Sequence, residues 1–183
     1  MRYIKIDKED VCNGNGLRVV LWLSGCSHHC KGCQNTQTWD EDSGIKFNNN
    51  TKAELFNELK KDYISGITLS GGDPLYSKNL ENVLNLTNEI RLSFPDKNIW
   101  IYSGFYWEEI FEPSFTEQSE YRIDEYLKAS ELRKNIISNC DVFIDGRYVE
   151  ELRDITLKWC GSSNQRVIDV QESLRLGEVT LWK

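Results

Sequence analysis

The sequence predicts an α/β fold whose mainly parallel sheet forms a partial, open barrel of the TIM type, (β/α)6-like in its repeat. Three observations lead to this class. Strand-like segments alternate with amphipathic helical segments, and this alternation favours right-handed βαβ units. About four to six such strands can be counted, too few for a complete eight-stranded barrel. The 183 residues are also fewer than the ~250 of a complete barrel, so we expect one domain over 1–183.

The N-terminal part of the chain supplies the strongest strand signals. Residues 3–6 alternate between apolar and polar types, and the two Asn-Gly pairs at 13–16 are typical of a turn. Residues 17–24 form the strongest strand, because β-branched and aromatic side chains dominate them. In chain order, the elements expected next are a helix capped by Asn50 or Thr51 and ending near Ile64, a strand at 66–70, a helix over 77–94, a strand at 98–103, a helix over 123–138, and strands at 141–145, 166–169 and 179–182. Residues of about 106–130 fit these patterns least, so we expect an irregular insertion there.

Composition and charge argue against several classes of function. The net charge is −7 and the pI is about 5.0, which argues against electrostatic binding to nucleic acid or to an anionic membrane surface. No apolar run reaches the ~18 residues of a membrane span, and the N-terminus lacks the apolar core of a signal peptide. We therefore expect a cytoplasmic protein, in which thiols stay reduced.

The chain has six cysteines, which in a reducing compartment favour metal binding or catalysis over disulfide bonds. Cys12, Cys140 and Cys160 stand alone in the sequence. A lone cytoplasmic cysteine is most often a small buried hydrophobic residue, and we interpret these three in that way.

Cys26, Cys30 and Cys33 form a C-x3-C-x2-C cluster directly after the strongest strand. Three thiols cannot pair off in local disulfides, since one is always left over. Iron–sulfur clusters usually take four thiolates, so three thiolates suit a cluster with one open iron. The alternative is a structural zinc site, completed by His28 or His29. Because α/β folds carry their chemistry outside the carboxyl ends of strands, this position favours a functional site.

Three other predicted strands also end in residues suited to ligand contact. Gly71-Gly72-Asp73-Pro74 follows one of them, Ser103 closes the next, and Asp145-Gly146-Arg147 ends a third. Two glycines let the backbone carbonyls approach a ligand ammonium, and the aspartate adds negative charge. The alternatives are an ordinary strand-to-helix turn at the glycines and a surface ion pair at the arginine.

The cysteine spacing resembles that of the radical S-adenosylmethionine (SAM) superfamily. The resemblance implies a 4Fe–4S cluster on Cys26, Cys30 and Cys33, with the amino and carboxylate groups of SAM on the fourth iron. It also implies one-electron reduction of the sulfonium, which gives methionine and a 5′-deoxyadenosyl radical. Gly32 stands where the superfamily usually has an aromatic residue before the third cysteine. This sequence therefore has no aromatic side chain at that position to pack on adenine.

The same resemblance implies which residues contact SAM. The Gly-Gly-Asp run resembles the superfamily's Gly-Gly-Glu motif, which contacts the SAM amino group. Arg147 is implied as a partner of the SAM carboxylate. The implied cofactor-binding residues are Gly32, Cys33, Gln34, Gly71, Gly72, Asp73, Ser103, Asp145 and Arg147.

Three further runs narrow the resemblance. The run 33–40 (CQNTQTWD) is similar to the C-x-N-x-x-T-W-[DE] run of activases of glycyl-radical enzymes. The run 13–18 (NGNGLR) is similar to their D-G-P-G-x-R run, with Asn in place of Asp and Pro; the alternative is a turn with a surface Arg. The run 159–169 (WCGSSNQRVID) resembles W-R-G-S-S-N-Q-R-I-I-D, with Cys160 in place of Arg. That last pattern belongs to one subfamily, which activates anaerobic (class III) ribonucleoside-triphosphate reductases.

The subfamily resemblance implies an enzyme that takes a Cα hydrogen from a glycine of its partner reductase and leaves a glycyl radical there. It implies an external electron donor, reduced flavodoxin or a similar protein. Two alternatives stay open. One is another small radical SAM enzyme, of the formate-lyase activase or 7-carboxy-7-deazaguanine synthase type. The other is a non-enzymatic zinc-binding interaction protein.

Overall fold

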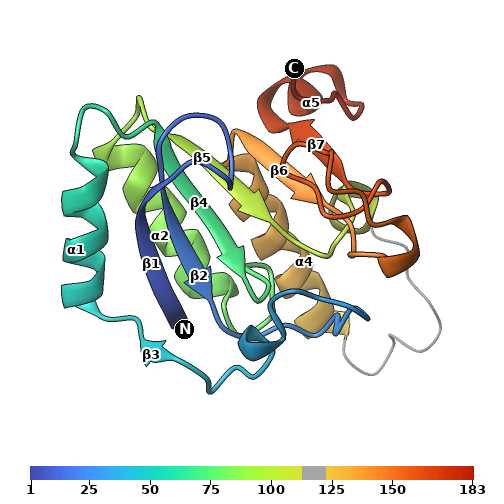
Figure 1. Cartoon of the computed structure of the whole chain (residues 1–183), viewed down its shortest axis with the longest axis horizontal. Coiled ribbons are helices and arrows are strands. Elements are labelled where there is room, and N and C mark those ends of the chain that lie inside the picture. The colour runs from blue at the N-terminus through green and yellow to red at the C-terminus, as the bar shows by residue number, and fades with distance from the viewer. Residues whose placement is uncertain (113–122) are drawn as a thin grey trace.

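The computed structural model describes residues 1–112 and 123–183, and its strands form a seven-stranded sheet in the order β3-β1-β2-β4-β5-β6-β7 (Figure 1). The strands are β1 Arg2–Asp10, β2 Arg18–Leu23, β3 Ile45–Lys46, β4 Gly66–Gly71, β5 Asn98–Tyr102, β6 Val142–Asp145 and β7 Arg166–Asp169. The helices are α1 Asn49–Leu59, α2 Leu80–Ser93, α3 Trp107–Phe111, α4 Ile123–Ser138 and α5 Val170–Leu176, with 3-10 turns η1 Thr36–Thr38 and η3 Glu150–Leu152.

The four neighbouring strands β2, β4, β5 and β6 run parallel, and β1, β3 and β7 pair antiparallel with their neighbours. The connections explain the difference. Helices α1, α2 and α4 lie between successive parallel strands, whereas β1 reaches β2 through residues 11–17 alone. That loop is too short for a crossover of about a dozen residues, which parallel pairing requires. The α/β class and the mainly parallel centre are confirmed, but the sheet is not closed and a partial barrel of six β/α units is not confirmed.

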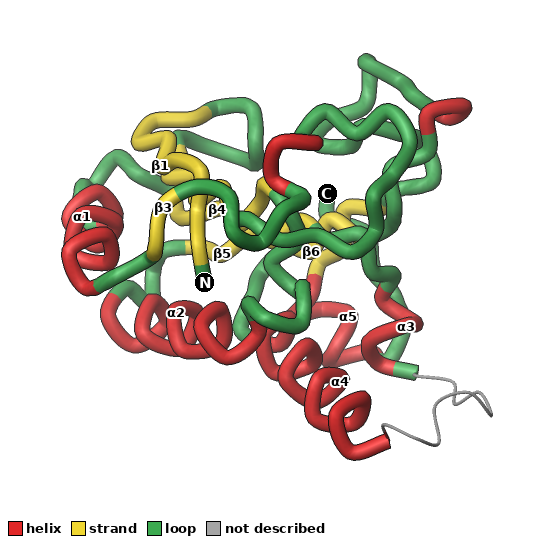
Figure 2. Tube along the Cα trace, turned by 90° about the horizontal axis from the view of Figure 1, so that it is seen from below, coloured by secondary structure: helices red, strands yellow, loops and turns green. Residues whose placement is uncertain are grey.

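The helices cover one face of the sheet, and the main core lies between the two layers (Figure 2). Every second side chain of β2, namely Val19, Leu21 and Leu23, belongs to that core, as the alternation of a strand requires. Leu55 and Leu59 of α1 join it at helical spacing. Among the helices of the described ranges, none has the length and apolarity that a membrane span needs.

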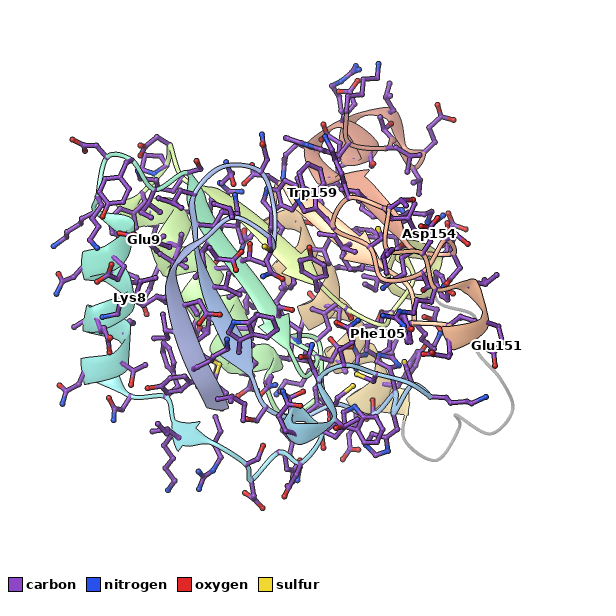
Figure 3. The ribbon with its side chains drawn as sticks, in the orientation of Figure 1. Lys8, Glu9, Phe105, Glu151, Asp154 and Trp159 are labelled. Atoms are coloured by element: carbon purple, nitrogen blue, oxygen red, sulfur yellow. The ribbon has the colours of Figure 1, made fainter. Side chains whose placement is uncertain are left out.

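The opposite face of the sheet carries a second, smaller apolar cluster. Trp100 of β5 lies at its centre, with ring centroids 4.8 Å from Trp159 and 5.8 Å from Trp182 (Trp159 is labelled in Figure 3). Cys160 packs at its margin. The loop after β6 and the C-terminal residues therefore cover part of this face.

The bounds of α1 differ from the sequence prediction at both ends. Asn48, and not Asn50 or Thr51, caps the helix, because its side chain accepts hydrogen bonds from the backbone N–H groups of both later residues. The helix ends at Leu59 and not near Ile64. Three consecutive asparagines offer equivalent caps in sequence, so the choice among them depends on the path by which the chain enters the helix.

The predicted strand at 179–182 is wrong, since it contributes only an isolated bridge between Leu181 and Ile168. The sequence reading also missed β3, α3 and α5, all of which are short. Helix α5 carries visible signals, a cap by Asp169 and a left-handed Gly177 at its end. Part of the expected insertion at 106–130 is regular, because α3 and the start of α4 lie in it; residues 113–122 are outside the described ranges.

Arg18 is fully buried, so the alternative of a surface arginine at the end of the run 13–18 is wrong. Its guanidinium donates to Thr68 Oγ1 at 2.8 Å and to the carbonyl of Ile67 at 2.6 Å. Burial lowers the pKa of Arg18 to about 10. The run 13–18 therefore ends in a residue that ties β2 to β4 at the amino ends of the parallel strands.

The lone cysteines differ from one another. Cys140 is buried, as predicted, and burial raises its pKa. The prediction is wrong for Cys12, which is exposed, and Cys160 is only half-buried. Cys160 packs against the second apolar cluster, and this burial raises its pKa to about 11.

Candidate functional site

The carboxyl ends of the four parallel strands meet at one edge of the sheet. Leu23 at the end of β2 pairs with Gly71 at the end of β4, and Tyr102 at the end of β5 pairs with Ile144 of β6. The residues that follow these ends contain most of the predicted site. The fold thus brings the cysteine loop (26–33) to the same edge as the Gly-Gly-Asp turn.

Backbone hydrogen bonds join the cysteine loop to the Gly-Gly-Asp turn. The N–H of Asp73 donates to the carbonyl of Gly25 at 2.7 Å, and the N–H of Gly72 donates to the carbonyl of Leu23 at 2.8 Å. A Cβ at Gly72 would lie 2.5 Å from the Gly25 oxygen, and one at Gly71 would lie 2.6 Å from the Leu23 oxygen. Both glycines are therefore required by the close approach of β4 to the chain that leaves β2.

The three cysteines of the loop are free, half-buried thiols. Burial raises the pKa of Cys26 to about 11, and the charge of Asp73 adds to this shift against opposing backbone hydrogen bonds from His28 and His29. Burial likewise raises the pKa of Cys30. Burial of Cys26 and Cys30 therefore favours their neutral thiols, and a bound metal centre would supply the positive charge that makes thiolates favourable.

The two histidines of the loop are turned to other partners. The side chain of His28 is 6% exposed, and its Nε2 lies 2.8 Å from Oδ2 of Asp73. His29 is exposed and stacks on Trp39 with a centroid distance of 4.7 Å. The donor set that remains is three thiols, which fits a cluster with three protein ligands. Within residues 1–112 and 123–183, no three His, Cys, Asp or Glu side chains are arranged around a single metal ion, but a cluster takes its thiolates on different irons.

Gly32 is held against a segment that sequence reasoning missed. Its φ is +76°, and a Cβ there would lie 1.9 Å from Oε2 of Glu150. The hydroxyl of Tyr148 donates to the same oxygen at 2.7 Å, and Lys31 pairs with Glu151 at 3.2 Å. The segment 148–151 therefore lies beside the cysteine loop, with Glu151 labelled at its outer end in Figure 3. Only the absence of a side chain at residue 32 hinted at such a contact.

Asp73 and Ser103, both predicted site residues, contact each other. The Ser103 hydroxyl donates to Oδ1 and Oδ2 of Asp73 at 2.8 and 2.9 Å. The backbone N–H groups of Gly104 and Leu75 donate to the same carboxylate at 3.1 and 2.7 Å. With a side chain only 1% exposed, Asp73 is an internal junction whose oxygens are already engaged by protein groups.

Asp145 and Arg147 lie at the same edge but take different partners. Asp145 is fully buried and accepts from the N–H of Trp107 at 2.9 Å and from Nε of Arg166 at 3.1 Å. Arg147 forms an ion pair with Glu109 at 2.9 Å, and both side chains are 40% exposed. Arg147 thus forms a surface ion pair, which was the alternative to ligand contact. Its contact with a ligand stays a prediction.

The polar run 162–166 holds the end of β6 in place. Gln165 accepts from the N–H of Gly161 at 2.9 Å and donates to the carbonyl of Gly146 at 2.9 Å. Asn164 donates to the carbonyl of Arg147 at 2.8 Å. These contacts fix the loop that follows Asp145, which gives the run a structural role that its sequence alone did not reveal.

An open pocket of about 660 Å³ adjoins the first cysteine. It is lined by Cys26, Ser27, His29, Trp39, Asp40, Glu41 and Tyr76. Gln34, which directly follows the cysteine loop, is exposed. The cysteine loop is therefore reachable from solvent, although its sulfurs are half-buried.

Comparison with known proteins identifies the class to which this site belongs. Residues 12–168 match the family model described as a 4Fe–4S single cluster domain, and this span contains the cysteine loop and all four parallel strands. The chain is a 4Fe–4S single cluster domain protein. It belongs, more narrowly, to the family of anaerobic ribonucleoside-triphosphate reductase-activating proteins, which makes it an activating enzyme.

Three relatives carry that family's name and match nearly the full length. The protein of Enterobacteria phage T4 is 41% identical over 167 residues, 91% of this chain and 93% of the relative. That of Haemophilus influenzae is 36% identical over 167 residues, 90% of this chain and 96% of the relative. That of Escherichia coli (strain K12) is 37% identical over 169 residues, 91% of this chain and 97% of the relative.

Proposed function

We propose that this chain activates an anaerobic ribonucleoside-triphosphate reductase as a radical SAM enzyme. The observation that carries the proposal is the set of three half-buried free thiols, Cys26, Cys30 and Cys33, at the carboxyl end of β2. Both histidines of the loop contact other residues, so a cluster held by these three thiols would have one iron open to SAM. The names of the relatives supply the partner reductase.

Cys26, Cys30 and Cys33 would hold a 4Fe–4S cluster, which when bound would supply the electron for reductive cleavage of SAM and so for removal of a Cα hydrogen from a glycine of the reductase. The chain's own residues hold and orient the reactants. The backbones of Gly32 to Gln34 and of Gly71 and Gly72 are the nearest candidates to contact SAM, because a side chain would obstruct the approach at each glycine. Ser103 and Asp145 support this edge, and Arg147 would leave Glu109 for the SAM carboxylate.

The proposed setting is the cytoplasm, where reduced flavodoxin or a similar donor delivers the electron. Neither nucleic acid nor a membrane takes part. The site lies at the edge of an open sheet, on loops that a glycine-bearing segment of the reductase can reach. We also propose that the open sheet is a partial barrel of the TIM type, (β/α)6-like in its repeat.

The test is anaerobic reconstitution followed by assay of SAM cleavage. Wild-type protein with a photoreduced cluster is expected to release 5′-deoxyadenosine, and Cys30→Ala is expected to release none. Cys12→Ala is the matched control, because Cys12 is an exposed cysteine outside the site and its loss should change nothing. A reconstituted wild-type protein that leaves SAM intact would overturn the proposal.

The partner is tested by electron paramagnetic resonance (EPR). A glycyl radical on co-incubated anaerobic reductase is expected, and cleavage of SAM without that radical would favour another small radical SAM enzyme. Metal analysis after anaerobic purification excludes the zinc alternative if iron and sulfide approach about four each per chain.

A further inference from the structure

His28 lies in the middle of the cysteine loop and belongs to a buried polar junction at the strand ends. Its Nε2 is 2.8 Å from Oδ2 of Asp73, and the exposed fractions of the two side chains are 6% and 1%. This close contact is not a hydrogen bond in the structure, and Nε2 has no hydrogen-bond partner within the described residues. A buried polar nitrogen is costly to leave without a polar neighbour, and the Asp73 carboxylate is the group that lies beside it.

The ring of His28 is also fixed by close packing. A Cβ at Gly104 would lie 2.4 Å from its Cδ2 atom, so the residue after Ser103 has no side chain where the ring sits. The edge of the ring meets Phe105 with a centroid distance of 4.7 Å and an interplanar angle of 75°. Arg133 of α4 lies over Phe105, with its guanidinium carbon 4.3 Å from the centroid of the Phe105 ring. His28 thus touches the chain after β5 as well as the turn after β4.

We propose that His28 is a positioning residue, which holds the cysteine loop against the ends of β4 and β5 through Asp73. The inference rests on the proposed function and deepens it. The loop carries the cluster thiols, and Asp73 directly follows the glycines whose backbone is proposed to contact SAM. The His28–Asp73 contact therefore sets how the cysteine loop lies against the glycines that are proposed to contact SAM.

The engaged state of Asp73 supports this assignment. Its carboxylate already accepts from Ser103, Gly104 and Leu75, so most of its roughly four acceptor positions are taken by protein groups. Its charge is better placed to hold His28 than to contact a ligand. The adjacent His29 is exposed and lacks such contacts, which shows that the junction is particular to one of the two histidines.

The test compares variants of the two neighbouring histidines in the reconstituted full chain. His28→Leu keeps the volume and removes the polar atom, His28→Gln restores a side-chain N–H, and His29→Asn is the control, because Asn tolerates the positive φ of 46° at residue 29. Iron content, the Kd for SAM and the EPR spectrum of the reduced cluster with and without SAM are measured. Changes to groups that orient metal ligands typically weaken affinity by about 10–100-fold.

We expect His28→Leu to keep its iron but to bind SAM at least about tenfold more weakly and to lose the change in EPR spectrum that SAM causes, with His28→Gln restoring both. His29→Asn should resemble wild type. If His28→Leu matches wild type in both measurements, the positioning role is wrong although the proposed function stands. If wild-type protein shows no response to SAM, the proposed function itself fails.

Should His28→Leu not fold, Ser103→Ala gives an independent test of the junction. It removes the hydroxyl that fixes the Asp73 carboxylate from the other side. The same weakening of SAM binding, to a smaller degree, is expected, and unchanged binding together with an unchanged EPR response would count against the junction.

Discussion

At the scale of single residues, the glycines of the site mark where two segments of backbone come close. Gly71 and Gly72 were predicted from their sequence motif, and the structure shows the local reason, because a Cβ at either would press on backbone oxygens of Leu23 or Gly25. Gly32 is different, since the atom beside it belongs to a side chain that lies far along the sequence, Glu150.

Gly32→Ala tests that contact against a matched glycine. Gly177 has nearly the same φ, 75° against 76°, but a Cβ there would meet nothing within 4 Å. Gly177→Ala should therefore lower the free energy of unfolding only by the cost of placing an alanine in a left-handed conformation, about 1–2 kcal/mol. Gly32→Ala should lower it further, because Glu150 has to move, and adding Glu150→Ala should remove the excess. Equal effects of the two glycine variants in urea unfolding would contradict this.

At the scale of elements, caps and connecting loops decide where each helix and strand begins. Asn48→Ala should lower the free energy of unfolding by about 1 kcal/mol, because the N–H groups of Asn50 and Thr51 lose their acceptor. Asn50→Ala is the control and should be neutral or slightly stabilising, since Asn50 lies within α1, where alanine is the better helix former. A larger loss from the Asn50 variant, measured by thermal unfolding, would reverse the assignment of the cap.

Strands β6 and β7 are joined by an ion pair between the fully buried carboxylate of Asp145 and the guanidinium of Arg166. Arg166→Leu would leave the fully buried carboxylate of Asp145 without its cation, and we expect a loss of about 3 kcal/mol in unfolding free energy. Arg175→Leu removes an arginine from an exposed pair with Glu172 and should have little effect. Comparable unfolding midpoints for the two variants would show that Asp145 does not depend on Arg166.

At the scale of the whole molecule, much of the fold followed from the sequence and part of it could not. Alternating strands and helices predicted the parallel centre, and the strand-end motifs predicted that Cys26, Gly72, Ser103 and Asp145 lie at the carboxyl ends of strands of one sheet. Their partners were beyond reach, because they depend on contacts far apart in the chain. His28 reaches Asp73 across 45 residues of sequence, and nothing local to either distinguishes it from its exposed neighbour His29.

The metal centre should also act on the stability of the whole fold. A cluster binds the folded loop and not the unfolded chain, so reconstitution is expected to raise the Tm of the wild-type protein measured under anoxia. Removal of the cluster by a chelator should return the Tm to its initial value. Cys30→Ala should show no such rise, and a rise equal to that of wild type would mean that Cys30 is not a ligand.

The two outer strands of the sheet determine how another chain can approach it. At one edge, the two-residue β3 covers only Arg2 and Tyr3 of β1, whose remaining residues are mostly charged and pair irregularly with β2. At the other edge, Leu181 bridges to Ile168 of β7. Short, charged or covered edges prevent a foreign strand from extending a sheet. A protein that binds this molecule is therefore expected to engage its loops by side-chain contacts, and the sheet is protected against the strand-by-strand growth that leads to aggregation.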